Sequence, residues 1–154
     1  MMTTCKNASY TAANVISFRG EVTVPELHAV IKRLDDYIEL EGAKKTGEIV
    51  TAVHVLYLET SVSDIEIFVA IDKAIPSTET FIFAPSLELT NCLTVKHQKP
   101  PYLVPGIYTD IYRKAQEMNL EIEPLFYNVS KGEMSGIWAN GAVETDVYVA
   151  VKKV

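Results

Sequence analysis

The chain contains an internal repeat, and this repeat constrains its fold more than any other feature of the sequence. The segment 67–73 (IFVAIDK) returns 80 residues later as the segment 147–153 (VYVAVKK). Applied without a gap, the same offset pairs Val15 with Val95, Pro25 with Pro105, Leu27 with Ile107, Ile31 with Ile111 and Glu66 with Asp146. A fixed internal period implies that one structural unit is used twice. We therefore predict a single domain over residues 1–154, with equivalent units at about 12–75 and 88–154.

The composition suits one globular domain and excludes some partners. The net charge is −6, from 14 basic and 20 acidic residues. Because nucleic-acid binding needs a basic surface that neutralises phosphates, we expect no direct contact with nucleic acid. No apolar run approaches the roughly 18 residues that a membrane span requires. The polar opening residues also lack the apolar segment of a secretory signal. We therefore expect a cytoplasmic protein without membrane contact.

No sequence motif indicates a metal, a cofactor or a catalytic nucleophile. Cys5 and Cys92 lack CxxC spacing, which favours two reduced thiols. His28, His54 and His97 are scattered without ligand spacing such as HxxxH. The chain contains neither a phosphate-binding glycine loop nor the surroundings of a serine or cysteine nucleophile. We expect no metal, no cofactor and no catalytic residue, and a binding protein rather than an enzyme.

The first unit has the pattern strand, helix, strand, strand. The first ten residues are predicted to form a loose leader, and 14–19 a short strand. From Pro25, apolar residues recur at helical spacing until Gly42 ends the helix. The segments 48–58 and 64–73 are rich in β-branched and aromatic residues and are predicted to be strands.

The second unit is predicted to repeat this order. A short extra strand at 80–84, ended by Pro85, links the two units. The elements that follow are a strand at 88–97, a helix at about 103–118, and strands at 125–129 and 143–152. The loop between the last two strands is longer than the usual hairpin loop of about two to five residues, and such loops tend to be functional or disordered. Tyr108 and Tyr112 lie on the apolar stripe of the helix, which favours core packing.

Alternation along the last strand of each unit separates an aliphatic face from a polar and aromatic face, because successive side chains on a strand point to opposite sides. The aliphatic face consists of Ile65, Ile67, Val69 and Ile71 in the first unit and Thr145, Val147, Val149 and Val151 in the second. The opposite face presents Glu66 and Phe68, and Asp146 and Tyr148. We expect the aliphatic faces to pack on the helices.

The order of these elements resembles that of the GyrI-like family, which comprises gyrase-inhibitor-like proteins and the effector-binding domains of bacterial transcription activators. The resemblance is carried by the strand 64–72 (DIEIFVAID), by 95–97 (VKH) and by Pro101 with Tyr102 at the second helix. It covers nearly the whole chain. It implies an α+β fold in which two pseudo-twofold-related β-α-β-β units form one curved antiparallel sheet with two main helices. It also implies that a small lipophilic, often cationic, ligand binds in the cleft between the units.

The chain departs from the family at two points. The family's pocket glutamate lies two residues before the tyrosine of the seventh strand, here Tyr127, and this position is Leu125. Some family members hydrolyse strained electrophiles with that glutamate, so a hydrolase using Glu66 or Glu123 as the base is the weakest alternative. Family members that regulate transcription also carry a helix-turn-helix region before this domain. Because this chain begins almost at the first strand, we expect a stand-alone domain.

The polar and aromatic face supplies a substitute for the missing glutamate. If the units meet about a twofold axis, the acids and rings of both units frame the cleft, where they would attract a lipophilic cation. Trp138, in the long loop, is a candidate lid. The full set of candidate ligand-binding residues is Tyr57, Glu66, Phe68, Tyr127, Trp138, Asp146 and Tyr148. The alternative is that these residues form the solvated face of a one-sided sheet.

Two functions of different classes remain open. The first is a stand-alone binding protein that senses or sequesters a small lipophilic molecule. The second is a protein-interaction module, such as an inhibitor or a toxin-associated partner protein. We favour the binding protein, acting as a monomer or a homodimer.

Overall fold

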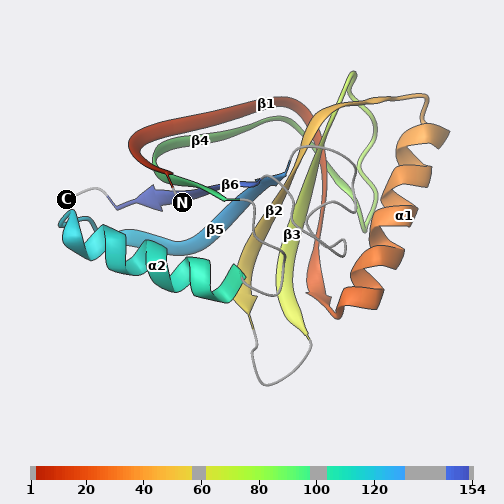
Figure 1. The fold of residues 1–154 in the computed structure, drawn as a ribbon. Coiled ribbons are helices and arrows are strands. Elements are labelled where there is room, and N and C mark those ends of the chain that lie inside the picture. Colours follow the sequence, from red (N-terminus) through yellow and green to blue (C-terminus); the bar gives the residue numbers. More distant parts are fainter. Residues whose placement is uncertain (1–2, 57–61, 98–103, 131–144, 153–154) are drawn as a thin grey trace.

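A computed structural model describes residues 3–56, 62–97, 104–130 and 145–152 (Figure 1). Within these residues the elements in chain order are β1 (Thr3–Val22), α1 (Val24–Leu40), β2 (Lys45–Leu56), β3 (Ser63–Ile71), β4 (Ile82–His97), α2 (Val104–Glu117), β5 (Ile122–Ser130) and β6 (Thr145–Val151). The predicted α+β class is confirmed. Both predicted helices and the strands β2, β3, β5 and β6 lie within a few residues of their predicted positions.

The strands form one closed antiparallel barrel in the order β1-β3-β2-β5-β6-β4. The barrel is closed because every strand pairs with two neighbours: β1 with β3 and β4, β2 with β3 and β5, and β6 with β5 and β4. The two helices lie outside this ring, with α1 at the right and α2 at the lower left of Figure 1. The inner surface of the barrel is therefore built from strands alone in the described part of the chain.

The long strands β1 and β4 bend together across the barrel (Figure 1). Their pairing register shifts on both sides of Ala8. The nearby residues Asn7 and Asn91 have positive φ angles of 59° and 53°. Asparagine enters this left-handed region more readily than most residues, and bulges increase the local twist of a strand. These irregularities explain how two strands of such length follow the curvature of a small barrel.

Two sequence predictions for these strands are wrong. Residues 3–10 are not a loose leader, because they belong to β1 and pair with the second half of β4. The strands predicted at 80–84 and 88–97 are one strand, and Pro85 does not end it. At that point β4 pairs with β1 only, because β6 pairs with residues 92–97. A proline without an N–H is tolerated where one side of a strand is unpaired.

Helix α1 begins and ends where the sequence predicts. The Thr23 side chain accepts a hydrogen bond from the backbone N–H of Glu26, and the Glu26 carboxylate accepts one from the backbone N–H of Thr23. This reciprocal capping box satisfies two amides that the first helical turn leaves unpaired. Gly42 follows the helix with a positive φ of 71°. Among the described residues, no helix is long and apolar enough to cross a membrane.

Helix α2 is fixed to the sheet by Tyr108. The Tyr108 ring stacks on Phe126 of β5, with ring centroids 4.0 Å apart. Its hydroxyl accepts a hydrogen bond from Nδ2 of Asn128 at 2.8 Å. Both Tyr108 and Asn128 are buried. Core packing of Tyr108 is confirmed, whereas Tyr112 is 43% exposed and meets Phe126 only with the edge of its ring.

The aliphatic faces of the strands pack on the helices, as predicted. Ile65, Ile67, Val69 and Ile71 of β3 and Val147 and Val149 of β6 belong to one core cluster with residues of both helices. The helical members of this cluster are Leu27, Val30, Ile31, Leu34 and Ile38 of α1 and Ile107, Tyr108, Ile111 and Ala115 of α2. Burial of these side chains is the main force that holds the helices against the barrel.

The strand registers do not follow the gap-free offset of 80 residues. Val15 pairs with Ala70, so the offset predicts that Val95 pairs with Ala150. Instead Val95 pairs with Val147, and the partner of Ala150 is Cys92. Relative to the offset of 80 residues, the pairing of β4 with β6 is therefore displaced by three residues from the pairing of β1 with β3. Alignment of the sequence without gaps does not reveal this displacement.

Candidate functional site

Four adjacent strands place the predicted site residues in two parallel rows. The first row runs across the sheet from Glu66 of β3 through Ala52 of β2 and Tyr127 of β5 to Tyr148 of β6. The second row lies two residues along each strand. It consists of Phe68, Val50, Val129 and Asp146, on the same strands in the same order. Directly paired residues point to the same face, and we call these eight residues the inner patch.

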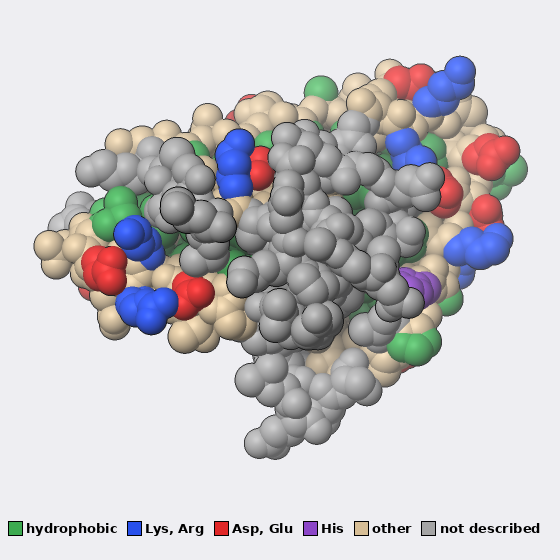
Figure 2. All heavy atoms as spheres, viewed as in Figure 1, with side chains coloured by type: hydrophobic (Ala, Val, Ile, Leu, Met, Phe, Trp, Pro, Cys, Tyr) green, Lys and Arg blue, Asp and Glu red, His purple; other side chains and the backbone are tan. Residues whose placement is uncertain are grey.

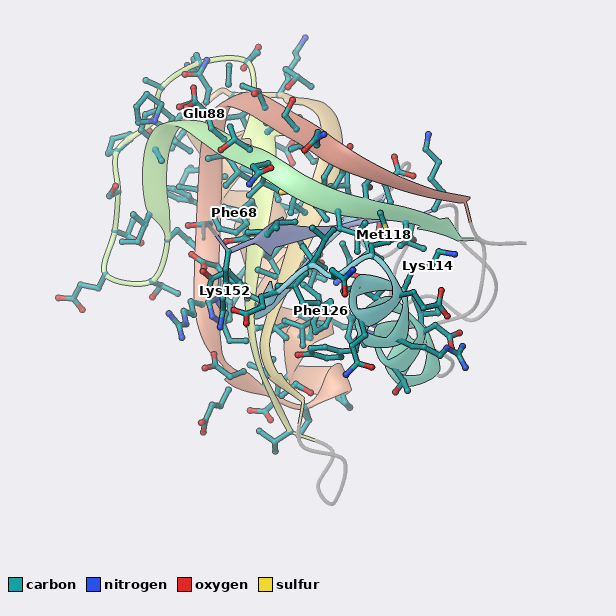
Figure 3. The ribbon with its side chains drawn as sticks, turned by 90° about the vertical axis from the view of Figure 1, so that its left-hand side faces the viewer. Phe68, Glu88, Lys114, Met118, Phe126 and Lys152 are labelled. Carbon is teal, nitrogen blue, oxygen red and sulfur yellow. The ribbon has the colours of Figure 1, made fainter. Side chains whose placement is uncertain are left out.

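The inner patch faces the interior of the barrel. Val50, Ala52 and Val129 are at most 2% exposed, yet none of them belongs to the core cluster that contains the helices. They are therefore buried on the other side of the sheet from the helices. In Figure 3, Phe126 lies beside α2 and Phe68 lies away from that helix.

Burial differs in a regular way between small and large residues of the inner patch. The small residues Val50, Ala52 and Val129 are fully buried and form an apolar floor. The larger Glu66, Phe68, Tyr127 and Tyr148 are only partly buried. Ala52 separates Glu66 from Tyr127, and its methyl group leaves space between their side chains. The arrangement is a low apolar floor with taller aromatic and acidic side chains around it.

Glu66 takes part in a polar network at one end of the first row. Its Oε1 lies 3.2 Å from Nε2 of His54, and the two side chains are 25% and 18% exposed. Arg19 is the direct cross-strand neighbour of Glu66 and forms an ion pair with Asp64 at 3.3 Å. The hydrogen bond from Arg19 to Asp64, with smaller contributions from both carboxylates, raises the pKa of Arg19. Glu66 is therefore surrounded by groups that compensate its charge.

Tyr127 lies in the middle of the site and is affected by Glu66. Burial, followed by the charges of Glu66 and Cys92, raises the pKa of the Tyr127 phenol. Burial likewise raises the pKa of the Cys92 thiol, which disfavours a reactive thiolate. Because Glu66 and Tyr127 both pair beside Ala52, they lie on the same face of the sheet.

Tyr148 adds a second ring to the aromatic part of the site. Its ring lies 5.7 Å from that of Tyr10, centroid to centroid, with an angle of 51° between the planes. Tyr127 is its direct cross-strand neighbour. Tilted ring pairs at this separation are favourable. The three tyrosines from β1, β5 and β6 therefore form an aromatic cluster at one end of the inner patch.

Asp146 occupies the corner of the inner patch diagonally opposite Glu66. Its residue is 9% exposed, and its Oδ1 atom is buried without a hydrogen-bond partner. Lys96 is its direct neighbour on β4, but the Lys96 side chain is exposed and the two form no ion pair. Buried carboxylate oxygens normally accept hydrogen bonds, so Asp146 is an unusual group in this structure.

Five of the seven predicted site residues lie on the inner patch: Glu66, Phe68, Tyr127, Asp146 and Tyr148. Tyr57 and Trp138, including the proposed lid, lie outside the described residues. Leu125, at the position of the family's glutamate, is partly buried. Glu123, the other candidate base, is exposed. The described residues contain no group of three or more His, Cys, Asp or Glu side chains that could hold a metal ion.

Sequence reasoning missed three contributors to the site. Tyr10 was overlooked because it lies in the predicted leader. His54 was considered only as a metal ligand, although it is the hydrogen-bond partner of Glu66. Ala52 carries no chemical function, and its importance as a spacer depends on the register of β2 with both neighbours. Alternation along β2 places Val50, Ala52 and His54 on one face, and this pattern could have indicated Ala52 and His54 as contributors to the site.

Comparison with known proteins shows similarity of fold without detectable similarity of sequence. A scan against protein-family models finds no match, and a search of curated proteins finds none. The cryo-EM structure of the EcmrR–DNA complex in EcmrR-RPo aligns with a TM-score of 0.71 at 17% identity, over 100% of this chain and 58% of that chain. The crystal structure of the EcmrR C-terminal domain aligns with a TM-score of 0.69 at 15% identity, over 100% of this chain and 99% of that chain. The chain thus has the fold of the EcmrR C-terminal domain and spans 58% of the EcmrR chain seen in the complex.

Proposed function

We propose that the protein binds a small lipophilic molecule on the inner patch and thereby senses or sequesters it. The observation that carries this proposal is the combination of a fully buried apolar floor with partly exposed aromatic side chains on the inside of the barrel. Binding sites for small molecules are typically concave and mostly apolar, with few polar groups that fix orientation. The inner patch has this composition.

The dimensions of the inner patch suit a molecule with two or three rings. Its rows cross four strands, which corresponds to roughly 14 Å, and the rows are roughly 7 Å apart along the strands. Phe68 lies at one end of the patch and Tyr148 near the other. A flat ligand lying across Ala52 and Val50 would contact aromatic side chains at both ends. Such contacts would replace water on apolar surface, which is favourable.

The fold supports a place for this protein beside the GyrI-like family. The order strand, helix, strand, strand occurs twice along the chain. We propose that the two halves are related by an approximate twofold axis, with the displacement of three residues described above. On this basis the inner patch corresponds to the ligand cleft that the resemblance implies, although its acids stand on β3 and β6 rather than at Leu125. We further propose that the protein is cytoplasmic and acts as a monomer or a homodimer.

We also propose that the protein makes no direct contact with nucleic acid. The net charge of −6 disfavours binding to phosphates. Figure 2 shows acidic and basic side chains interspersed among the described residues of the visible face, without a broad basic area. One similar structure is an EcmrR–DNA complex, which weighs against this part of the proposal. A gel-shift titration with DNA at low salt tests this proposal. Retardation of the DNA by the protein would refute the absence of direct contact with nucleic acid.

Titration with Nile red, a neutral lipophilic dye, tests the proposed function. We expect saturable enhancement of its fluorescence, and a loss of affinity of about tenfold when Tyr127 and Tyr148 are both replaced by alanine. The matched control is Tyr112→Ala, because Tyr112 is an exposed tyrosine on α2 outside the inner patch. Equal affinity of all three proteins would show that the dye binds elsewhere. No saturable binding to the wild-type protein would contradict the proposed function.

A protein-interaction module is the second candidate. It is favoured by Leu40 at the end of α1, whose side chain is 80% exposed. The other large exposed apolar residues in the described part of the chain are Ile82 and Tyr112, on β4 and α2. These residues belong to three different elements, so they give this candidate less support than the inner patch gives the first. Native mass spectrometry of protein purified from its own host would favour this candidate if a second polypeptide remained bound.

A further inference from the structure

We propose that the ligand is a protonated lipophilic amine, and that its N–H group donates a hydrogen bond to Asp146 rather than to Glu66. This inference rests on the proposed function and specifies which ligand the inner patch accepts. It follows from a difference between the two acids of the patch, which the sequence presents as equivalent.

Glu66 already has partners for its charge. Its carboxylate is 3.2 Å from the imidazole of His54, and Arg19 lies directly across the strand pair. Arg19 in turn is held by Asp64 through Nε and Nη2. Because His54 and Arg19 already compensate the charge of Glu66, a ligand cation gains less from Glu66 than from an acid without an ion-pair or hydrogen-bond partner.

Oδ1 of Asp146 is buried and accepts no hydrogen bond. Among the described residues, no lysine or arginine forms an ion pair with Asp146. A buried carboxylate oxygen without a hydrogen bond destabilises the free protein, because that atom has lost water without a replacement. A ligand that supplies both a positive charge and a hydrogen-bond donor would remove this penalty. The free energy of ligand binding is therefore most favourable when the ligand donates a hydrogen bond to Asp146.

The surroundings of Asp146 indicate the rest of the ligand. Val129, its cross-strand partner, is 2% exposed and apolar. Tyr148 lies two residues further along β6 on the same face, and Tyr127 pairs directly with Tyr148. Tyrosine faces attract cations and pack against apolar groups. The nitrogen of the ligand would lie at Asp146, while its apolar part would extend over Val129 and Val50 toward Phe68.

The hydrogen-bond requirement distinguishes protonated amines from other lipophilic cations. A primary, secondary or tertiary ammonium carries at least one N–H and can donate to Oδ1 of Asp146. A quaternary ammonium has the same charge but no donor, so it would leave the oxygen unsatisfied. A neutral alcohol can donate a hydrogen bond but brings no charge. These three classes therefore separate charge from hydrogen bonding at the same site.

Isothermal titration with three probes of one carbon skeleton tests this inference. The probes are 4-phenylbutylamine, its trimethylammonium derivative and 4-phenylbutanol. They are compared on the wild-type protein, on Asp146→Asn with Asp146→Ser as a second neutral replacement, and on Glu66→Gln. Circular dichroism confirms that each variant is folded. The amine is protonated at pH 7, as a lysine side chain is.

We expect the wild-type protein to bind the amine at least about tenfold more tightly than either of the other probes. Both Asp146 variants should lose most of this preference, while their affinity for the alcohol stays within about threefold. The Glu66→Gln variant should keep the preference for the amine. Equal preference in the wild-type and Asp146 variants, or its loss in Glu66→Gln, would overturn the inference while leaving the proposed function intact. If no probe binds the wild-type protein, the proposed function fails and the inference fails with it.

Discussion

The carboxylate of Glu66 and the imidazole of His54 form a 3.2 Å contact between β3 and β2 at the edge of the inner patch. Neither residue is a direct cross-strand partner of the other, because Glu66 pairs with Ala52. The contact therefore runs diagonally across the strand pair. It occupies the Glu66 carboxylate at one end of the patch, whereas Oδ1 of the diagonally opposite Asp146 has no hydrogen-bond partner among the described residues.

Replacing Glu66 by glutamine should lower the pKa of Tyr127. Burial is the larger reason why this pKa is raised, and the negative charge of Glu66 adds to it because that charge disfavours the phenolate. Titration of ring-labelled tyrosine by NMR measures the change. Glu123→Gln is the matched control, since Glu123 is an exposed acid on the same strand as Tyr127. An unchanged Tyr127 pKa in Glu66→Gln would show that the two side chains do not share one space.

Tyr108→Phe should make the protein less sensitive to alkali. Burial strongly raises the pKa of Tyr108, and the hydrogen bond from Asn128 opposes this only in part. A phenol whose folded pKa lies above its unfolded value of about 10 stabilises the protein fully below that pH. This contribution is lost as the pH rises toward the folded pKa. Urea unfolding at a series of pH values above 9 should therefore show a shallower loss of stability in Tyr108→Phe.

At neutral pH the same variant should be less stable by about 1 kcal/mol, because Nδ2 of Asn128 loses an acceptor in a buried position. Tyr112→Phe should match the wild-type protein in both respects, since Tyr112 is 43% exposed. If Tyr108→Phe and the wild-type protein lost stability in parallel above pH 9, Tyr108 would not be the buried group that titrates.

Leu34→Ala should destabilise the protein by about 2–5 kcal/mol, because it removes a fully buried side chain and leaves a cavity between α1 and the barrel. Leu40→Ala, on the same helix, should change the free energy of unfolding by less than about 0.5 kcal/mol, because Leu40 is 80% exposed. Chemical denaturation of both variants measures the difference. Similar losses would mean that α1 does not pack on the barrel through its predicted stripe.

The helices could be predicted closely from the sequence because their determinants are local. Pro25 and the capping residues mark the start of α1, Gly42 marks its end, and the apolar stripe fixes the buried face. The two faces of β3 and β6 could also be predicted from the sequence, because the alternation of side chains along a strand does not depend on neighbouring strands. These local rules identified four of the eight residues of the inner patch: Glu66, Phe68, Asp146 and Tyr148.

The remaining features depend on contacts between distant segments. Residues 3–10 form a strand only because β4 offers a partner, and Pro85 is tolerated only because β6 ends its pairing at residue 92. The inequality of Glu66 and Asp146 likewise depends on Arg19 and His54, which come from other strands. Strand register, including its displacement by three residues from the offset of 80, is set by such tertiary contacts, so local patterns did not reveal it.

The central claim is that small lipophilic molecules bind on the inner patch, and mapping of backbone amide shifts during titration with 4-phenylbutylamine tests it most directly. We predict that the largest shifts occur at Ala52, Tyr127, Asp146 and Tyr148 and saturate together, whereas the outer residues of α1 and α2 remain unchanged. Shifts confined to the helices, or scattered over the surface without saturation, would contradict the claim.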